Sequence, residues 1–584
     1  MIPTPTRLLG RQTTRLLVVV IFCLLVIHFF YRSSSKPLID SDVRTGAIPA
    51  ADSLEAQGEI GKEKANLKSI RDYTAFFDGL EAYMPKSPSI KDKYKNEKAP
   101  EIKNENDDFL LSKSLLENVL DIPHSTYQEL KDSHSRYVDI HMNKLIENYG
   151  ISTFGNILKS DPEWGTYQGS SGYVMVGGGR FNWLSYLVIK QIRATGSKMP
   201  IELFIASHDE YEKDFCEELL PRYNAHCNLF DSSLSTNLKE RFDLGGYQYK
   251  MLAILSSRFE NVMYVDSDNF PAKNVDYILE SDLYKEKNLI LWPDAWGRTA
   301  NPKFYEIAGV EVKENKVRYS DYDRKQAERE GLSGVKPLSE YNFENSHFHD
   351  FEGTIPNPTS ETGMFVINKT SHMRTLLLSL YYNVFGPNYY YPLLTQGSAG
   401  EGDKETFIAA AHVMNEPWFQ TLKQFQFTGY VSEADNKFAS KALSHYDPVL
   451  SAVKQENLDV VFNHLSYPKY YPNWLVDNHD LIYENLGKHI RMYSSINENV
   501  GYDFDLRVLQ FFTQGMCPNY YDSTTGKAID GEDIYRNKEY MGKYLHYVSS
   551  EEELERQRCE QVFIPHLKWL KETTQFPENL VVNV

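Results

Sequence analysis

Two aspartates one residue apart, Asp266 and Asp268, are the best candidates in this sequence for binding a metal ion. They follow Val262–Val265, a short apolar run of β-forming residues that predicts a strand buried on both faces. Asn269 and Pro271 are expected to end that strand. Open α/β sheets bind ligands at the carboxyl ends of their strands, and carboxylates bind hard cations. The stretch therefore predicts a site for a metal ion and a phosphate group.

The Asp-x-Asp spacing alone is weak support for such a site. The chain repeats it three more times, in polar or aromatic surroundings that a solvated surface explains: Asp40/Asp42, Asp321/Asp323 and Asp503/Asp505. Only Asp266 and Asp268 follow an apolar strand. Even there, a strand-end turn with side-chain-to-backbone hydrogen bonds is the competing explanation.

A glycine turn is a candidate nucleotide-binding element. The apolar run Tyr173–Val176 predicts a strand that enters three glycines and Arg180, followed by a helix over Phe181–Ala194. Glycines let the backbone approach a diphosphate, and a helix N-terminus favours its charge. Gly177 and Arg180 are therefore candidate nucleotide contacts, although an ordinary tight turn explains the pattern equally well.

Two further stretches carry residues that could complete a charged site. Lys250 lies at the start of a predicted helix, where the helix dipole does not favour a cation, so a nearby negative ligand would explain it. An exposed lysine is the commoner case. His464 ends the late apolar strand Val460–His464, and Lys469 follows it. A histidine there could be the third metal ligand, while an ordinary hydrogen-bonded histidine is the alternative.

Three carboxylates are candidates for the catalytic or acceptor side of a site. Asp403 and Glu405 lie in a glycine-rich loop beside the helix predicted over Thr406–Met414. Such loops often carry functional residues, and a solvated loop is the alternative. Glu361 begins the triplet Glu361-Thr362-Gly363, which precedes the strand predicted over Met364–Asn368.

Composition excludes some classes of function. The chain has 584 residues, 41% hydrophobic and 24% charged, which are ordinary values for a globular protein with a large core. The net charge of −18 argues against a protein built to bind nucleic acid.

The N-terminus predicts a membrane anchor. Arg7, Arg11 and Arg15 precede the apolar run Leu16–Tyr31, which is slightly short for a span of about 20 residues. A short span suits the thinner membranes of the early secretory pathway, and the arginines favour a cytosolic N-terminus. A cleaved signal peptide is the alternative, but the bulky Phe29–Arg32 is unlike a cleavage site.

The sequence divides into six expected regions: a cytosolic tail (1–15), a transmembrane signal anchor (16–31), a luminal stem (32–106), a helical lead-in (107–150), a catalytic domain (151–500) and a C-terminal extension packed on it (501–584). Four cysteines on the luminal side permit two disulfides in three possible connectivities. The simplest pairing is Cys216–Cys227 with Cys517–Cys559, and buried free thiols are the alternative. One glycosylation sequon begins at Asn368.

Taken together, the strand with Asp-x-Asp, the preceding lysine-bearing helix and the late His-x4-Lys resemble sugar-nucleotide-dependent glycosyltransferases of the type A fold. That fold is α/β and Rossmann-like, with a mostly parallel central sheet flanked by helices. A set of short motifs is similar, more closely, to the fungal Golgi α-mannosyltransferases that branch the mannan outer chain, and above all to their α-1,2 members: Tyr249-Lys250-x-x-Ala253, Asp268-Asn269-x-Pro271, Trp292-Pro293-Asp294, Glu361-Thr362-Gly363 and Gly402-Asp403-Lys404-Glu405. The resemblance covers about Gly172 to Lys469, and the anchor and stem are similar too.

The resemblance implies an enzyme that transfers mannose with retention from GDP-mannose to the α-1,6-mannan backbone of N-linked glycans. It implies Mn²⁺, a Golgi membrane location with one N-terminal helix, and a luminal catalytic domain. The roles that it implies are as follows: Asp266, Asp268 and His464 hold the metal; Gly177, Arg180, Lys250, Asp266 and Lys469 contact the nucleotide diphosphate; Asp403, Glu405 and Glu361 lie on the acceptor side.

Two alternatives stay open. The same fold could transfer mannose in an α-1,3 linkage or use a UDP-sugar. The chain could also be a non-catalytic luminal lectin or assembly subunit. The complete set of Asp266, Asp268, His464 and Lys469 argues against that second alternative, because a binding module needs no diphosphate clamp.

Overall fold

The computed structural model describes residues 77–100, 109–149, 167–230, 241–242, 244–484, 486–518 and 539–576, all within the unit Lys62–Val584. The predicted cytosolic tail, the predicted anchor and residues 32–76 of the predicted stem lie outside these residues. Within the described ranges, no helix is both long enough and apolar enough to cross a membrane.

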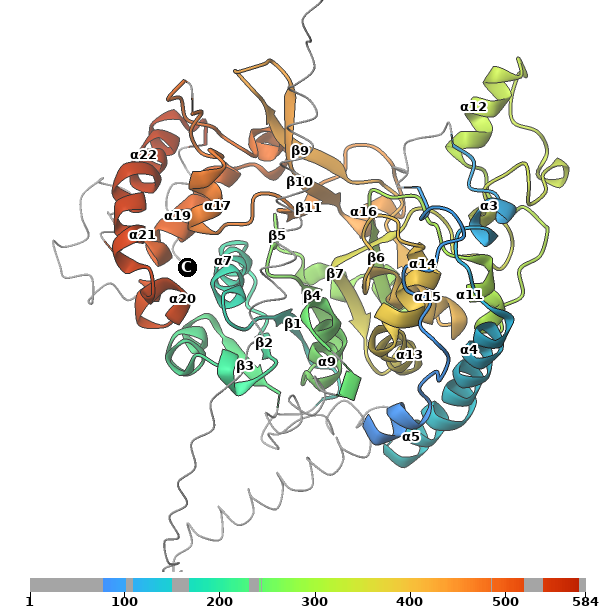
Figure 1. The fold of residues 1–584 in the computed structure, drawn as a ribbon. Helices are drawn as coiled ribbons and strands as arrows, with labels where there is room; N and C mark the ends of the chain where they lie inside the picture. The colour runs from blue at the N-terminus through green and yellow to red at the C-terminus, as the bar shows by residue number, and fades with distance from the viewer. Residues whose placement is uncertain are drawn as a thin grey trace, which may run out of the picture. The chain divides into compact units, whose positions relative to one another are not determined.

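Seven strands form a central sheet in the described chain, in the order β3-β2-β1-β4-β7-β6-β8. Figure 1 shows the strands from β3 to β6 in that order. Their bounds are β1 (Ser171–Val176), β2 (Ile201–Ile205), β3 (Ala225–Leu229), β4 (Asn261–Val265), β6 (Leu289–Pro293), β7 (Ser360–Asn368) and β8 (Phe419–Gln420). β7 is antiparallel to both of its neighbours, and the other neighbouring pairs are parallel. This confirms the predicted α/β class with a mostly parallel sheet, and the arrangement fits the type A fold.

Helices cover both faces of the central sheet. The main ones are α7 (Phe181–Ala194), α9 (Tyr249–Ser256), α13 (Met373–Val384), α15 (Lys404–Val413) and α19 (Phe504–Met516). Met263 and Val265 of β4 join the apolar core that contains α7 and α19. Val262 and Tyr264 join the core that contains α9, α13 and α15. Because both faces of β4 are buried, its sequence is a continuous apolar run.

A smaller antiparallel sheet continues directly from β4. Its order is β5-β11-β10-β9, with bounds β5 (Asn269–Pro271), β9 (Gln426–Val431), β10 (Phe438–Tyr446) and β11 (Val460–His464). The strand before the acidic pair ends at Val265, ahead of Asn269 and Pro271, which themselves form the next strand, β5. Pro271 is tolerated there because β5 is an edge strand. In the pairing of β5 with β11, His464 lies opposite Asn269, next to the predicted acidic pair.

The folded part of the chain begins earlier than predicted. Residues 77–100 were expected to belong to the stem, yet Phe77, Leu80 and Ile90 are at most 1% exposed. The Ile90 N–H donates to the Asn388 carbonyl at 3.0 Å, and the Ala99 N–H donates to the Gln396 carbonyl at 2.9 Å. This segment is thus part of the fold. The predicted lead-in contains α3 (Lys113–Glu117), α4 (His124–Arg136) and α5 (Asn143–Tyr149).

Both predicted disulfides are present. Cys216–Cys227 joins a helical turn to β3, and Cys517–Cys559 joins the end of α19 to the segment between α21 (Glu552–Arg558) and α22 (Ile564–Thr573). The sequon residue Asn368 is half-buried, and its side-chain amide donates to Asn261 Oδ1 at 2.8 Å.

The sequence predicts that Asp503 and Asp505 lie on a solvated surface. In the structure both residues are buried. Asp503 Oδ1 caps α19 by accepting the Leu506 N–H at 3.1 Å. The Asp505 side chain accepts the backbone N–H groups of Met492 and Tyr493 at 2.7 and 2.9 Å and is 3% exposed. Burial, with the neighbouring Asp503, raises the pKa of Asp505 to about 8.

Asp505 predicts a pH-dependent stability that the variant Asp505→Asn should lack. An unfolded aspartate titrates near pH 4, so between about pH 4 and 8 only the folded protein holds this proton. The free energy of unfolding should therefore fall as pH rises through that window, by up to about 1.4 kcal/mol per pH unit. Thermal unfolding of both proteins from pH 5 to 8 measures this. A stability difference that does not change with pH would contradict it.

Candidate active site

The acidic pair lies on a three-residue turn that joins the two sheets. The Asp266 N–H donates to the Gly363 carbonyl of β7 at 2.7 Å, and the Leu465 N–H, just after β11, donates to the Asp268 carbonyl at 2.9 Å. Gly363 approaches this turn so closely that a Cβ atom there would lie 2.7 Å from Asn269 Nδ2. The backbone of the turn is thus fixed from both sides, at the carboxyl end of β4.

Lys250 is a buried cation that joins two of the predicted site carboxylates. Its Nζ lies 3.4 Å from Asp266 Oδ2 and 2.9 Å from Asp403 Oδ2, and it donates to the Thr362 carbonyl at 2.8 Å. Burial alone would lower the pKa of Lys250, but Asp266 and Asp403 raise it above its usual value. Lys250 therefore stays charged, held by the protein's own carboxylates.

Asp266 is harder to ionise than an ordinary aspartate. Tyr264 donates its hydroxyl to Asp266 Oδ1 at 2.5 Å. Burial raises the pKa of Asp266 to about 6, against the lowering effect of Lys250. The two oxygens of Asp266 thus contact Tyr264 and Lys250, whereas His464 contacts Asp268 and Glu361. The metal role of Asp266 stays a prediction.

Asp268, His464 and Glu361 form a line of interacting side chains. His464 Nε2 lies 3.7 Å from Asp268 Oδ2, and its Nδ1 lies 3.1 Å from Glu361 Oε2. Because a carboxylate only accepts, Nδ1–H is the donor to Glu361. The Gly363 N–H donates to the other Glu361 oxygen at 2.7 Å, and Lys469 Nζ contacts Asp268 Oδ2.

These contacts set the protonation states in the absence of a ligand. Burial would lower the pKa of His464, but Glu361 and Asp268 raise it to about 10. Burial would raise the pKa of Asp268, but Lys469 and His464 hold it well below its usual range. The pKa of Glu361 is likewise lowered, chiefly by His464, against the effect of burial.

His445 is a site residue that the sequence analysis missed. It is fully buried on β10, and neither ring nitrogen has a hydrogen-bond partner among the described residues. Burial lowers its pKa to about 3, so the imidazole is neutral. One ligand atom each of Glu361, His445 and His464 lie within 4.8 Å of one another. The pairing of Leu443 with His464 puts His445 on the same sheet face, which no local sequence pattern indicated.

The glycine turn contributes its arginine to this edge of the sheet. Gly178 and Gly179 have φ of +104° and +52°, which favour glycine. The Gly177 and Gly178 N–H groups already donate within the protein, at 2.9 and 2.8 Å, so the expected Gly177 amide contact to a diphosphate is occupied. The Arg180 guanidinium is exposed and lies 5.2 Å from the ring centre of Tyr471, close to Lys469 in sequence.

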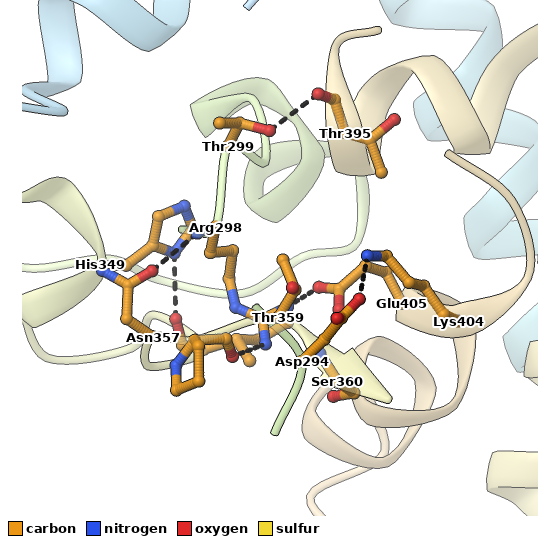
Figure 2. Close-up of polar contacts among 12 residues, drawn as sticks. Asp294, Arg298, Thr299, His349, Asn357, Thr359, Ser360, Thr395, Lys404 and Glu405 are labelled. Atoms are coloured by element: carbon orange, nitrogen blue, oxygen red, sulfur yellow. Dashed lines mark hydrogen bonds and ion pairs between the residues drawn. The ribbon is translucent and has the colours of Figure 1, made fainter. Parts of the chain in front are cut away.

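Glu405 does not have the environment of an acceptor contact. It is fully buried, pairs with the buried guanidinium of Arg298, and accepts the Ser360 N–H at 2.7 Å (Figure 2). Arg298 also donates to the Pro356 and Pro358 carbonyls. α15 begins at Lys404, within the stretch predicted as a loop. Glu405 therefore lies in the first turn of this helix, and its side chain is buried. This placement corrects the acceptor role predicted for Glu405.

The neighbouring Lys404 forms a second inward pair. Its Nζ lies 2.6 Å from Asp294 Oδ2, just after β6 (Figure 2). Neither residue was predicted as part of the site. Asp403 faces Lys250, and its side chain is 10% exposed, as is that of Asp294.

The arrangement is chemically suited to a cation and a phosphate group. Four carboxylates (Asp266, Asp268, Glu361 and Asp403) outnumber the cationic groups Lys250, Lys469 and protonated His464 around them. Binding a divalent cation through His464 Nε2 would release the proton there, and the cation would then offset the resulting excess of two negative charges. Arg180 and Lys469, on the more exposed side, provide positive charge for an anionic ligand.

We expect Glu405→Gln to reduce stability and leave ligand binding intact. Breaking one partner of a buried ion pair leaves the other charge unpaired, at a cost of roughly 3–5 kcal/mol. Thermal unfolding of Glu405→Gln and of the double variant Arg298→Met/Glu405→Met measures this. The double variant should recover part of the loss. A fully stable Glu405→Gln protein with no turnover would instead assign Glu405 to the chemistry.

Comparisons with known proteins give a consistent family. The mannosyltransferase family model Mannosyl_trans3 matches residues 170–447. Alpha-1,2-mannosyltransferase MNN2 of Candida albicans is 66% identical over 508 residues, covering 87% of this chain and 84% of that protein. Alpha-1,2-mannosyltransferase MNN2 of Saccharomyces cerevisiae is 32% identical, covering 81% and 83%. Among solved structures, an active-site mutant of LgtC aligns with 43% of this chain and 72% of its own, at 11% identity and a TM-score of 0.23, which is too low to support an argument.

Proposed function

This chain belongs to the fungal mannan-branching α-1,2-mannosyltransferases, and from that membership we propose its donor, acceptor and metal. The reaction transfers mannose with retention from GDP-mannose to the α-1,6-mannan backbone of N-linked glycans and needs Mn²⁺. The observation that carries the proposal is the line Asp268–His464–Glu361 at the carboxyl edge of the sheet, with Lys469 and Arg180 beside it. The proposed location is the Golgi membrane, single-pass type II with a luminal catalytic domain, and rests on residues 1–31.

The donor atoms fit a divalent cation. Metal–ligand bonds to carboxylate oxygen and imidazole nitrogen are roughly 2 Å, so two ligand atoms of one ion lie less than about 4 Å apart. Asp268 Oδ2 and His464 Nε2, at 3.7 Å, meet that limit. Glu361 accepts a hydrogen bond from His464 Nδ1–H, which directs Nε2 toward the ion. Asp268 and His464 would therefore hold Mn²⁺.

When bound, the cation would stabilise the negative charge that develops on the leaving diphosphate. Lys469 and Arg180 add positive charge for the same group. Lys250 holds Asp266 and Asp403 in place through ion pairs, and its buried charge adds to the positive potential at the site.

Retention is proposed to proceed by attack from the same face as the leaving phosphate. The alternative needs a carboxylate nucleophile and two displacements, by analogy with glycosidases. Asp403 is engaged by Lys250, and Glu361 by His464 and the Gly363 N–H. A carboxylate held by a cation is a weak nucleophile, so neither group suits the two-step route. In the same-face route the leaving phosphate accepts the proton of the acceptor hydroxyl.

The alternatives have less support. The named relatives are α-1,2-mannosyltransferases, which disfavours α-1,3 transfer. A non-catalytic lectin or assembly subunit would need neither the carboxylate excess nor Lys469 beside Asp268.

The decisive assay is transfer from radiolabelled GDP-mannose to an α-1,6-mannan acceptor, using the full chain with and without Mn²⁺. We expect product only with the metal, and an α-1,2-specific mannosidase should remove the added mannose. Asp268→Asn should lower turnover at least about a hundredfold, because removing one preorganised electrostatic contact that stabilises the transition state costs about 3–4 kcal/mol. Transfer from a UDP-sugar, or metal-independent product, would overturn the corresponding part of the proposal.

The metal ligands are tested by Mn²⁺ titration of thermal unfolding with GDP present, since a ligand raises the melting temperature of the state that binds it. Asp268→Asn should abolish the rise. Glu361→Gln should need roughly 10–100-fold more Mn²⁺, the usual effect of losing an orienting hydrogen bond. His445→Gln is the control and should change the midpoint less than about threefold. A loss in His445→Gln as large as in Asp268→Asn would favour the Glu361, His445 and His464 cluster as the metal site.

A further inference from the structure

A cavity of about 510 Å³ lies at the same edge of the central sheet as the charged site. One wall comes from the segment between α11 (Pro302–Ile307) and β7, and the opposite wall comes from the residues around β8. The first segment contains α12 (Asp321–Arg329) and side chains held by ion pairs. None of the predicted site residues lines this cavity.

Buried ion pairs hold the first wall in place. The Lys316 side chain is fully buried, with its Nζ 2.5 Å from Asp323 Oδ2 and 3.4 Å from Asp350 Oδ2. Arg318 donates to the His349 carbonyl and to the Thr354 hydroxyl, each at 2.8 Å. The wall is thus preformed, as ligand pockets usually are.

The lining is aromatic, polar and balanced in charge. Tyr319, Tyr322 and Trp418 present rings, and Asn357, Gln420 and Gln424 present amides. The charged lining residues are two arginines and two aspartates: Arg318, Arg324, Asp321 and Asp350. A site for a nucleotide would carry an excess of positive charge. Rings that pack on apolar faces, combined with amides that hydrogen-bond hydroxyls, suit a neutral sugar chain.

The cavity is connected to the charged site through the start of β7. Gln420 lines the cavity, and its Oε1 accepts the Ser360 hydroxyl at 2.9 Å. Ser360 precedes Glu361, which binds His464. Pro358, another lining residue, is three residues from Glu361, or roughly 10 Å at about 3.3 Å per strand residue.

We propose that this cavity binds neutral sugar residues of the acceptor chain that lie away from the reacting hydroxyl. The inference rests on the proposed function, in which the acceptor is an oligosaccharide. It locates the part of the site that distinguishes a long acceptor from a short one. Binding energy from remote sugar residues then lowers the barrier for long acceptors only.

The test compares a short and a long acceptor, α-1,6-mannobiose and α-1,6-mannohexaose, with GDP-mannose and the full chain. Trp418→Ala removes a ring, and Leu422→Arg places a bulky cation at a lining residue that is 58% exposed and so tolerates substitution. Phe438→Ala, on β10 and 51% exposed, is the matched control outside the cavity. Melting temperatures check that each variant is folded.

Both cavity variants should lower kcat/KM for mannohexaose about tenfold or more, the effect of losing about 1.4 kcal/mol of binding. The value for mannobiose and the KM for GDP-mannose should stay within about twofold of the unsubstituted protein, as both should in Phe438→Ala. Equal losses for both acceptors, or no loss in Leu422→Arg, would overturn the inference.

A direct binding measurement separates this inference from the proposed function. Calorimetric titration with mannohexaose alone needs no donor and no turnover. Binding that Leu422→Arg abolishes supports the cavity site even if GDP-mannose is not the donor. No binding to the unsubstituted protein, or unchanged binding to Leu422→Arg, rejects the cavity site even if transfer occurs.

Discussion

The three-residue turn between β4 and β5 is the constraint on which the rest of the site depends. β4 is a central strand of the large sheet and β5 is the edge strand of the small one, so the turn cannot move unless one sheet moves. Hydrogen bonds from Asp266 to β7 and from Leu465 to Asp268 fix its backbone. The pairing of β5 with β11 then brings His464 to the turn, although about two hundred residues separate them. The site is therefore positioned by two packed sheets, whereas the flanking loops contribute individual charged groups.

The carboxylates that form ion pairs in this protein fall into two groups that differ in solvent exposure. Arg298 and Glu405 are both fully buried, so their pair is part of the core and no ligand can compete for it. Asp266 and Asp268 have side chains that are 33% and 20% exposed, although Lys250 and Lys469 contact them. A partly exposed pair can exchange its partner for a ligand at modest cost, since water already screens it. Exposure, more than charge, separates the carboxylates available for chemistry from those that hold the fold.

Local sequence patterns predicted the elements that depend on local causes. The apolar runs gave the strands before Gly177 and Asp266, and the strand ending at His464 agrees with the prediction residue for residue. The two disulfides followed from sequence proximity. What failed depends on long-range contacts. Glu405 was predicted to lie in a loop. Its partner Arg298 is more than a hundred residues away, so no local pattern indicated that Glu405 is buried in an ion pair. His445 gave no signal because only strand pairing places it beside His464, and residues 77–100 are polar enough to resemble a stem although their few apolar side chains are buried.

The Cys517–Cys559 bond has a consequence for the integrity of the chain. The two cysteines are 42 residues apart in sequence. The loop that their bond closes contains every peptide bond between α19 and the segment before α22. A protease that cuts once anywhere inside this loop produces two polypeptides that remain one molecule. α19, which packs against α7 beneath the central sheet, would stay covalently attached to the C-terminal helices. Such a nicked protein would keep its mass on a non-reducing gel and separate into two bands only after reduction, so a cut here leaves the two pieces covalently joined in an oxidising compartment.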